Sequence, residues 1–176
     1  MTSARFAAQL NEQIGNELAA HNQYLACAIH YDAETMPQMA AFFYAQALEE
    51  REHAMMMVQY LLDTDQPVEI PAIPAAQSVF GTITEPVALA LDQEKRVTDQ
   101  IVELLKIARE ELDFASEQFM QWFIKEQVEE VATMSDLLTV VSRNTDDLNS
   151  IEDYVAREQS GEGADPTAPR AAGTAG

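Results

Sequence analysis

Apolar residues recur at helical spacing along most of the chain, and this pattern predicts five amphipathic helices. We expect them at about residues 3–35, 38–63 and 85–112, from shortly after residue 113 to about 143, and at about 147–158. Pro37 separates the first stripe from the second. Glu85-Pro86 begins the third helix, because proline is favoured in a first helical turn. The stripe of the second helix takes in Met57 but not Met55 or Met56, and that of the third continues to Leu112.

The lengths of the connections predict how these helices are arranged. Short turns near residues 36 and 113 make two antiparallel pairs, whereas residues 64–84 contain three prolines and one glycine and have no helical period. A helix of about 27 residues is roughly 40 Å long, and 21 extended residues reach about 70 Å at most, so this connection can cross the whole bundle. The predicted fold is all-α: a four-helix bundle with a long crossover between the second and third helices, and a short fifth helix.

The composition limits the domain organisation and the partners. Residues 1–158 are expected to form one domain, and the small, polar residues of 159–176 a flexible C-terminal tail. Thirty acidic against ten basic residues give a net charge of −20, which argues against nucleic acid and anionic membranes as partners. No apolar run approaches the roughly 20 residues of a membrane span, and the first residues lack the apolar core of a signal peptide, so we expect a cytoplasmic protein.

Polar residues interrupt each of the four long apolar stripes near its middle. Counted from the turns, the acidic ones fall within a few helical turns of the same height. Burying four glutamates without a counter-charge would force them to take up protons, whereas two divalent metal ions would balance them. Carboxylates with one imidazole suit iron or manganese. The residues that interrupt the stripes are Glu17 on the first helix, Glu50 and His53 on the second, Glu94 on the third, and Gln127 and Glu130 on the fourth.

Two further features surround these residues. Glu50 and His53 form an E-x-x-H pair, whose spacing directs both side chains to one ion. A second acidic set, Glu49, Glu126 and Glu129, is rotated by about 100° from the inner residues. These three are either surface salt-bridge residues or a third, weaker iron site leading outward. His21, one turn after Glu17, is either a partner of a metal ligand or a satisfied buried histidine.

The carboxylates, the E-x-x-H pair and their spacing resemble those of the bacterial non-haem ferritins over about residues 3–158. The resemblance implies a ferritin-like four-helix bundle with a non-haem di-iron centre and the following assignments. Glu17, Glu50 and His53 would hold the first iron, Glu50, Glu94 and Glu130 the second, and Glu49, Glu126 and Glu129 a third. Tyr24 and Trp122 match the family's aromatic residues beside the centre that can supply electrons, and Gln127 matches a glutamine that orients or weakly binds the second iron.

The same resemblance implies the function. Fe(II) would be oxidised by dioxygen or peroxide and stored as a ferric mineral inside a 24-subunit homo-oligomeric shell. Haem-binding ferritins carry E-M-x-H on the second helix, and here Arg51 occupies the methionine slot, so no haem is expected. Two other classes remain open: a di-iron oxidase or peroxidase that retains its iron, and a mini-cage protein that sequesters metal without a central site.

Overall fold

The computed structural model describes residues 2–158 and 165–173, and over these residues it is helical and contains no strand. The described helices begin and end within about two residues of the predicted positions. The expected all-α fold class is confirmed. The helices are α1 (Ala4–Ala33), α2 (Pro37–Asp63), α3 (Glu85–Glu110), α4 (Phe114–Arg143) and α5 (Leu148–Glu158).

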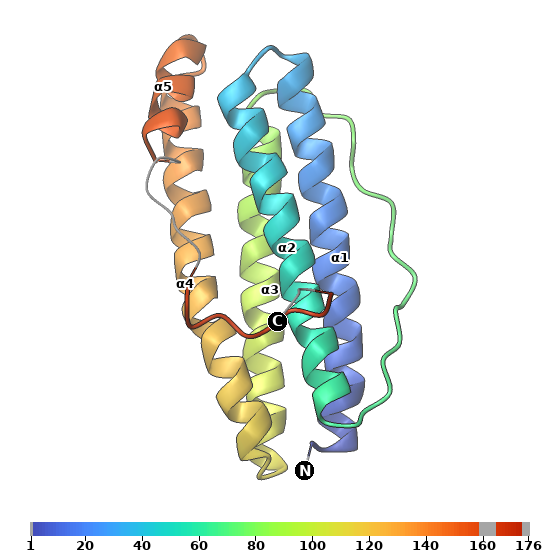
Figure 1. Cartoon of the computed structure of the whole chain (residues 1–176). Coiled ribbons are helices and arrows are strands. Elements are labelled where there is room, and N and C mark those ends of the chain that lie inside the picture. The colour runs from blue at the N-terminus through green and yellow to red at the C-terminus, as the bar shows by residue number, and fades with distance from the viewer. Residues whose placement is uncertain (1, 159–164, 174–176) are drawn as a thin grey trace.

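The four long helices form a bundle with one long crossover (Figure 1). α1 pairs with α2 and α3 with α4, each pair antiparallel, while α2 and α3 run in the same direction. The connection over residues 64–84 passes along the outside of α1 from one end of the bundle to the other. Hydrogen bonds hold it there, since Asn11 Nδ2 donates to Pro67 O and the side chain of Gln23 bonds both backbone groups of Gln77.

Side chains at the helix ends supply the caps that the backbone requires. The Ser3 hydroxyl accepts from Phe6 N at 3.1 Å, and Asp113 accepts from Ser116 N at 3.1 Å. The prediction for Leu112 was wrong. It follows the end of α3 with a φ of 53° and is 72% exposed, because the chain must reverse there to enter α4.

The short helix α5 is held by both apolar and polar contacts with α2. Ile151 and Val155 are buried against the bundle. The Glu152 carboxylate accepts from the backbone N–H groups of Gln38 and Met39 at 2.7 and 3.0 Å. An anion at a helix N-terminus stabilises both the open N–H groups and the helix dipole. Glu152 therefore fastens α5 to the start of α2, which has no side-chain cap from its own N-cap residue.

The core is divided into two apolar clusters. One contains Phe6, Leu10 and Met57 and the other Tyr31 and Phe43, so they occupy opposite halves of the bundle. On each long helix, the polar residues that interrupt the stripe come after the residues of one cluster and before those of the other. None of the described helices has the length and apolar composition needed to cross a lipid bilayer.

Part of the predicted flexible tail packs on the bundle. Residues 159–164 and 174–176 lie outside the described residues, but residues 165–173 run across α2 and α4 (Figure 1). Ala171 is buried in the first apolar cluster, and Ala172 N donates to Met55 O at 2.9 Å. Met56 joins the same cluster and is 6% exposed, so the prediction that only Met57 points inward was wrong. The C-terminal segment makes its contacts through small apolar residues such as Ala171 and Ala172, rather than through a long hydrophobic stripe.

Gly15 allows the crossover to lie close to α1, and this gives a testable prediction. A Cβ at this position would come within 2.3 Å of Pro71 Cγ. Glycine to alanine within a helix normally stabilises by about 0.5–1 kcal/mol. Here we expect Gly15→Ala to destabilise by about 1–3 kcal/mol, as overpacking does, and to lower the melting temperature.

The matched control is the double variant Gly15→Ala with Pro71→Ala, which removes the obstructing Cγ. Relative to Pro71→Ala alone, the added Gly15→Ala should then be neutral or stabilising. Equal melting losses in both backgrounds would contradict the close contact as the cause.

Candidate metal centre

The polar residues predicted from the interrupted stripes all lie inside the bundle. Their side chains come from four different helices. On each helix, the apolar residues before and after the polar ones are buried, and this packing turns the polar side chains into the bundle. The exposed fractions are at most 5%: Glu17 1%, Glu50 1%, His53 2%, Glu94 0%, Gln127 4% and Glu130 5%.

Three of these residues converge tightly. One ligand atom each of Glu17, Glu50 and His53 lies within 4.8 Å of the other two. His53 Nδ1 lies 3.5 Å from Glu50 Oε2. Among the described residues, Glu17 Oε2 has no hydrogen-bond partner although it is buried. Carboxylates with an unsatisfied buried oxygen, grouped with an imidazole, suit a divalent cation.

The electrostatics of the centre show that these carboxylates are uncompensated. Burial raises the pKa of Glu50 well above its ordinary value, and the nearby charges of Glu94 and Glu17 raise it further. Burial also raises the pKa of Glu94 to about 7 and lowers that of His53. No lysine or arginine is buried in the part of the chain that the structure describes. A cation bound between the carboxylates would supply the missing positive charge.

Glu94 and Glu130 are the other two buried carboxylates of the candidate centre. Neither belongs to the tight group of three, but the charges of both raise the pKa of Glu50. Tyr24 is fully buried, and its O–H donates to Glu94 Oε1. Burial raises the pKa of this phenol well above its ordinary value, and Glu94 adds to the effect, so Tyr24 keeps its proton at neutral pH.

Gln127 is oriented toward Glu94 as a hydrogen-bond donor. Thr98 Oγ1 lies 2.8 Å from the backbone oxygen of Glu94 and 2.9 Å from Gln127 Oε1, which share its one proton, and the amide nitrogen of Gln127 faces Glu94 Oε2 at 3.5 Å. With its carbonyl oxygen engaged by Thr98, Gln127 fits an orienting residue better than a metal ligand.

A second group of possible ligands lies outside the buried centre. Ligand atoms of Glu49, His53 and Glu126 also lie within 4.8 Å of one another, so His53 is shared by both groups. Burial raises the pKa of Glu126. Glu129 behaves differently, because it is exposed and pairs with Lys125 Nζ at 3.7 Å. The two alternatives for the outer acids, salt bridges or a third metal site, thus apply to different residues. Glu49 and Glu126 lie in a group of possible ligands, whereas Glu129 forms an ion pair.

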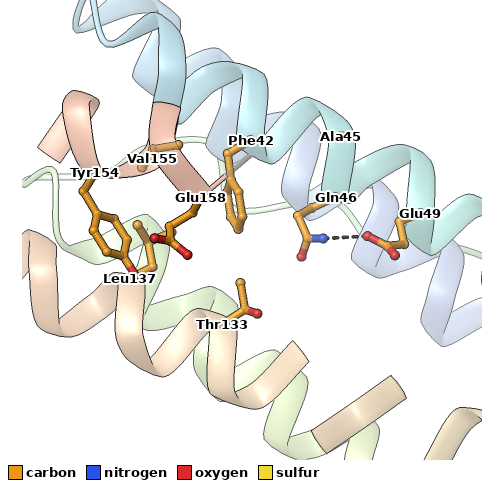
Figure 2. Close-up of a pocket in the computed structure, with 9 residues that line it drawn as sticks. All are labelled: Phe42, Ala45, Gln46, Glu49, Thr133, Leu137, Tyr154, Val155 and Glu158. Carbon is orange, nitrogen blue, oxygen red and sulfur yellow. Dashed lines mark hydrogen bonds between the residues drawn. The ribbon is translucent and has the colours of Figure 1, made fainter. Parts of the chain in front are cut away.

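The outer group opens into two neighbouring cavities. One, of about 390 Å³, is lined by His53, Glu126, Glu129 and Glu130 and, from the C-terminal segment, by Asp165. The other, of about 360 Å³, lies between α2, α4 and α5 (Figure 2). Glu49 and Gln46 line both, and Figure 2 shows the hydrogen bond of 2.7 Å that Gln46 donates to Glu49. Glu49 therefore stands between the two cavities.

Trp122 borders the centre on the same side. Its indole packs edge to face on the His53 ring, with centroids 5.6 Å apart. Its Nε1–H donates to Asp165 Oδ2 at 3.2 Å, which ties it to the C-terminal segment. His21 does not join the centre, since its Nδ1 lies 2.6 Å from Ala47 O, as expected of a satisfied histidine.

Two residues that contact this region were not found from the sequence. Gln13 is fully buried and donates to Glu17 Oε1 at 2.8 Å, and its only signal was its position one turn before that glutamate. Asp165 lies in a segment whose composition indicated flexibility, so no local pattern marked it.

Comparison with known proteins agrees with this geometry. The ferritin-like domain family matches residues 7–144. The chain is 56% identical to the Mycolicibacterium smegmatis protein named Ferritin BfrB, over 97% of this chain and 94% of the relative. The chain belongs to the ferritin family. Iron storage and ferroxidase activity are the functions of that family.

The names of other relatives include both the bacterioferritin and the non-haem subtype of ferritin, so they do not assign the chain to one of the two. A Mycobacterium tuberculosis relative named Bacterioferritin BfrB is 51% identical over 96% of this chain and 93% of its own length. A Staphylococcus aureus relative named Bacterial non-heme ferritin is 35% identical over 88% of this chain and 93% of its own length. The open-pore ferritin of Archaeoglobus fulgidus superposes with a TM-score of 0.86 at 26% identity, covering 92% of this chain and 100% of that structure.

Proposed function

We propose that this ferritin oxidises pairs of Fe(II) ions at the buried centre, with dioxygen or peroxide as the oxidant, and stores the Fe(III) as a mineral. The observation that carries the proposal is the uncompensated cluster of Glu17, Glu50 and His53 in the middle of the bundle. Each Fe(II) loses one electron, so a pair supplies the two electrons that reduce dioxygen to hydrogen peroxide, or hydrogen peroxide to water.

In this proposal the residues of the centre divide between two ions. Glu17, Glu50 and His53 hold the first, and Glu50, Glu94 and Glu130 the second. Negative ligands stabilise Fe(III) more than Fe(II), because the attraction grows with the charge of the ion. Oxidation therefore becomes easier in the site than in water.

Tyr24 and Trp122 are proposed as sources of further electrons during oxygen reduction. The hydrogen bond from the Tyr24 O–H to Glu94 supports this role, because a phenol that loses an electron must also release its proton. Trp122 contacts the ring of the ligand His53.

Glu49 and Glu126, with His53, are proposed as a third and weaker iron site, with Glu129 at its edge. The shared histidine and the adjoining cavities support a route by which ions pass between the buried centre and the surface. Half-exposed carboxylates bind less tightly than buried ones, so this site can release its ion.

The subtype and the assembly are also proposals. Arg51 is exposed and occupies the slot of the haem-binding methionine, which supports the non-haem type. We propose that the protein forms a closed 24-subunit shell in the cytoplasm. In each subunit, residues 1–158 would form the ferritin domain and residues 159–176 a C-terminal tail.

A single experiment tests iron storage. Aerobic Fe(II) is added in steps to the metal-free protein, and iron per chain and particle size are measured. We expect a large shell that takes up far more iron than its centres can hold. Retention of only about two irons per chain, the capacity of one dinuclear centre, on a small oligomer would instead identify an iron-retaining oxidase or peroxidase. Slow uptake without rapid oxidation would indicate a cage that lacks a working centre.

A further inference from the structure

Gln13 contacts one carboxylate of the centre and has no role in the function proposed above. It lies in α1, is 0% exposed, and donates through Nε2 to Glu17 Oε1 at 2.8 Å. The four-residue separation places both side chains on the same helical face. A fully buried amide beside a buried carboxylate is a costly arrangement unless its hydrogen bonds are satisfied.

Asn16 and Glu17 together favour one orientation of the Gln13 amide. Asn16 Nδ2 donates to Gln13 Oε1 at 3.0 Å, which engages the carbonyl oxygen and leaves the NH₂ group for the carboxylate. The reversed amide would bring its carbonyl oxygen against Glu17 Oε1, so that two acceptors faced each other at 2.8 Å. The chain of donors therefore runs in one direction, from Asn16 through Gln13 to Glu17.

This chain of hydrogen bonds separates the two oxygens of Glu17. Oε1 is occupied by Gln13, whereas Oε2 is buried without a hydrogen-bond partner among the described residues. The same carboxylate belongs to the group with Glu50 and His53. Glu17 is thus held with one oxygen hydrogen-bonded and the other without a hydrogen-bond partner, which makes Oε2 the oxygen more open to an ion.

The opposite side of the centre is built in the same way, which supports a common purpose. There the Thr98 hydroxyl shares its proton between the Gln127 carbonyl and the backbone oxygen of Glu94, and the Gln127 amide nitrogen faces the Glu94 carboxylate. In both halves a hydroxyl or amide donor fixes a glutamine, and the glutamine faces a metal-binding carboxylate. Partners of this kind set the orientation of a ligand and hence the affinity and coordination number of the ion.

We infer that Gln13 is a positioning residue for the first metal ion: with Asn16, it makes Glu17 bind that ion through one oxygen. The inference rests on the proposed function, because it presumes that Glu17, Glu50 and His53 hold an ion. It assigns to Gln13 the control of affinity at the first position and not at the second.

The test is an anaerobic titration of the metal-free, assembled protein with Co(II), whose visible absorption depends on its coordination number. For Gln13→Met, which keeps the length of the side chain but removes the donor, we expect the affinity for the first Co(II) to fall by about 10–100-fold. The absorption spectrum should change as Glu17 becomes able to bind through both oxygens. Affinity for the second Co(II) should stay within about threefold of the wild type, the usual context-dependent scatter.

Gln9→Met is the matched control on the same helix. Gln9 donates to Glu12 at 3.0 Å on the exposed side, so this variant also loses a glutamine–glutamate hydrogen bond, but away from the centre. It should leave both affinities and the spectrum unchanged. Asn16→Ala should weaken the first Co(II) less than Gln13→Met does, and should have no further effect in the Gln13→Met background.

Two results would overturn the inference: an unchanged first affinity and spectrum in assembled Gln13→Met, or an Asn16→Ala effect that persists without Gln13. Where Gln13→Met fails to assemble, Asn16→Ala alone decides, since an unaltered spectrum and affinity in that variant contradict the positioning role. Failure of the proposed function would look different, because the Glu50→Ala variant would then bind Co(II) as tightly as the wild type does.

Discussion

Glu50→Ala is expected to slow the initial oxidation of Fe(II) by at least about 100-fold while leaving the shell assembled. In the proposed centre Glu50 is a ligand of both ions. It is buried in the group with Glu17 and His53, and the charges of Glu94 and Glu130 also act on its carboxylate. Loss of a residue that only orients a metal ligand costs about 10–100-fold in affinity or activity. Loss of a shared ligand should cost at least as much as the upper end of that range.

The measurement is the initial rate of Fe(III) formation by absorbance at low iron per chain, together with particle size. Glu103→Ala is the matched control, because Glu103 is an exposed helical glutamate that pairs with Lys106 at 3.4 Å. Its initial rate should equal that of the wild type. A Glu50→Ala shell with a normal initial rate would refute the assignment of the centre.

The second large effect is on stability, where Glu94→Gln is expected to stabilise the metal-free protein at alkaline pH. Burial raises the pKa of Glu94 from 4.5 to about 7. A carboxyl whose pKa is raised on folding causes no penalty below its unfolded pKa, and the penalty grows from there until the pH reaches the folded pKa, above which it is constant. The window is therefore pH 4.5 to 7, and above it the difference corresponds to about 3 kcal/mol.

The expected result is a difference in melting temperature between Glu94→Gln and wild type that is small at pH 5, near the start of the window, and reaches on the order of 5–10 °C at pH 8. Glutamine keeps the volume of the side chain and can still accept from Tyr24. The measurement is thermal unfolding in the presence of a chelator, at matched ionic strength.

Two controls separate this cause from others. Saturating divalent metal should abolish or reverse the difference, because ligand binding stabilises only the protein that binds it. Glu103→Gln, an exposed glutamate, should show no pH-dependent difference. A Glu94→Gln advantage of the same size at pH 5 and pH 8 would show that ionisation of Glu94 is not its source.

The sequence predicted the bundle and the inner residues of the centre because both follow from helical periodicity. A buried stripe with a polar residue in its middle is visible along a single helix. The connection lengths then limited how the helices could be paired, so Glu17, Glu50, Glu94 and Glu130 were expected at one level before any contact was known. Their burial agrees with that expectation.

Predictions were less complete where a contact depends on the path of an irregular segment. Residues 165–173 have no stripe, yet Ala171 is buried and Asp165 bonds Trp122. The crossover seats Pro71 on Gly15, and a lone glycine in a helical pattern did not reveal that contact. Such packing depends on surfaces brought together by the fold, and the local sequence carries little information about them.

The outer acids and the glutamines show the same division at single residues. Glu49, Glu126 and Glu129 are equivalent by spacing, but only the first two share a ligand group with His53, while Glu129 meets Lys125. Hydrogen bonds of 2.9 and 3.5 Å determine how the Gln127 amide is oriented, and their partners lie on a different helix.

The sequence by itself thus determined the all-α bundle, its crossover and the level at which acidic residues enter the core, because backbone periodicity imposes these directly. The tertiary structure alone decided which oxygen of Glu17 is hydrogen-bonded, which outer acids converge on His53, and where the described C-terminal residues 165–173 lie. Those features depend on distances between side chains of different segments, which periodicity does not specify.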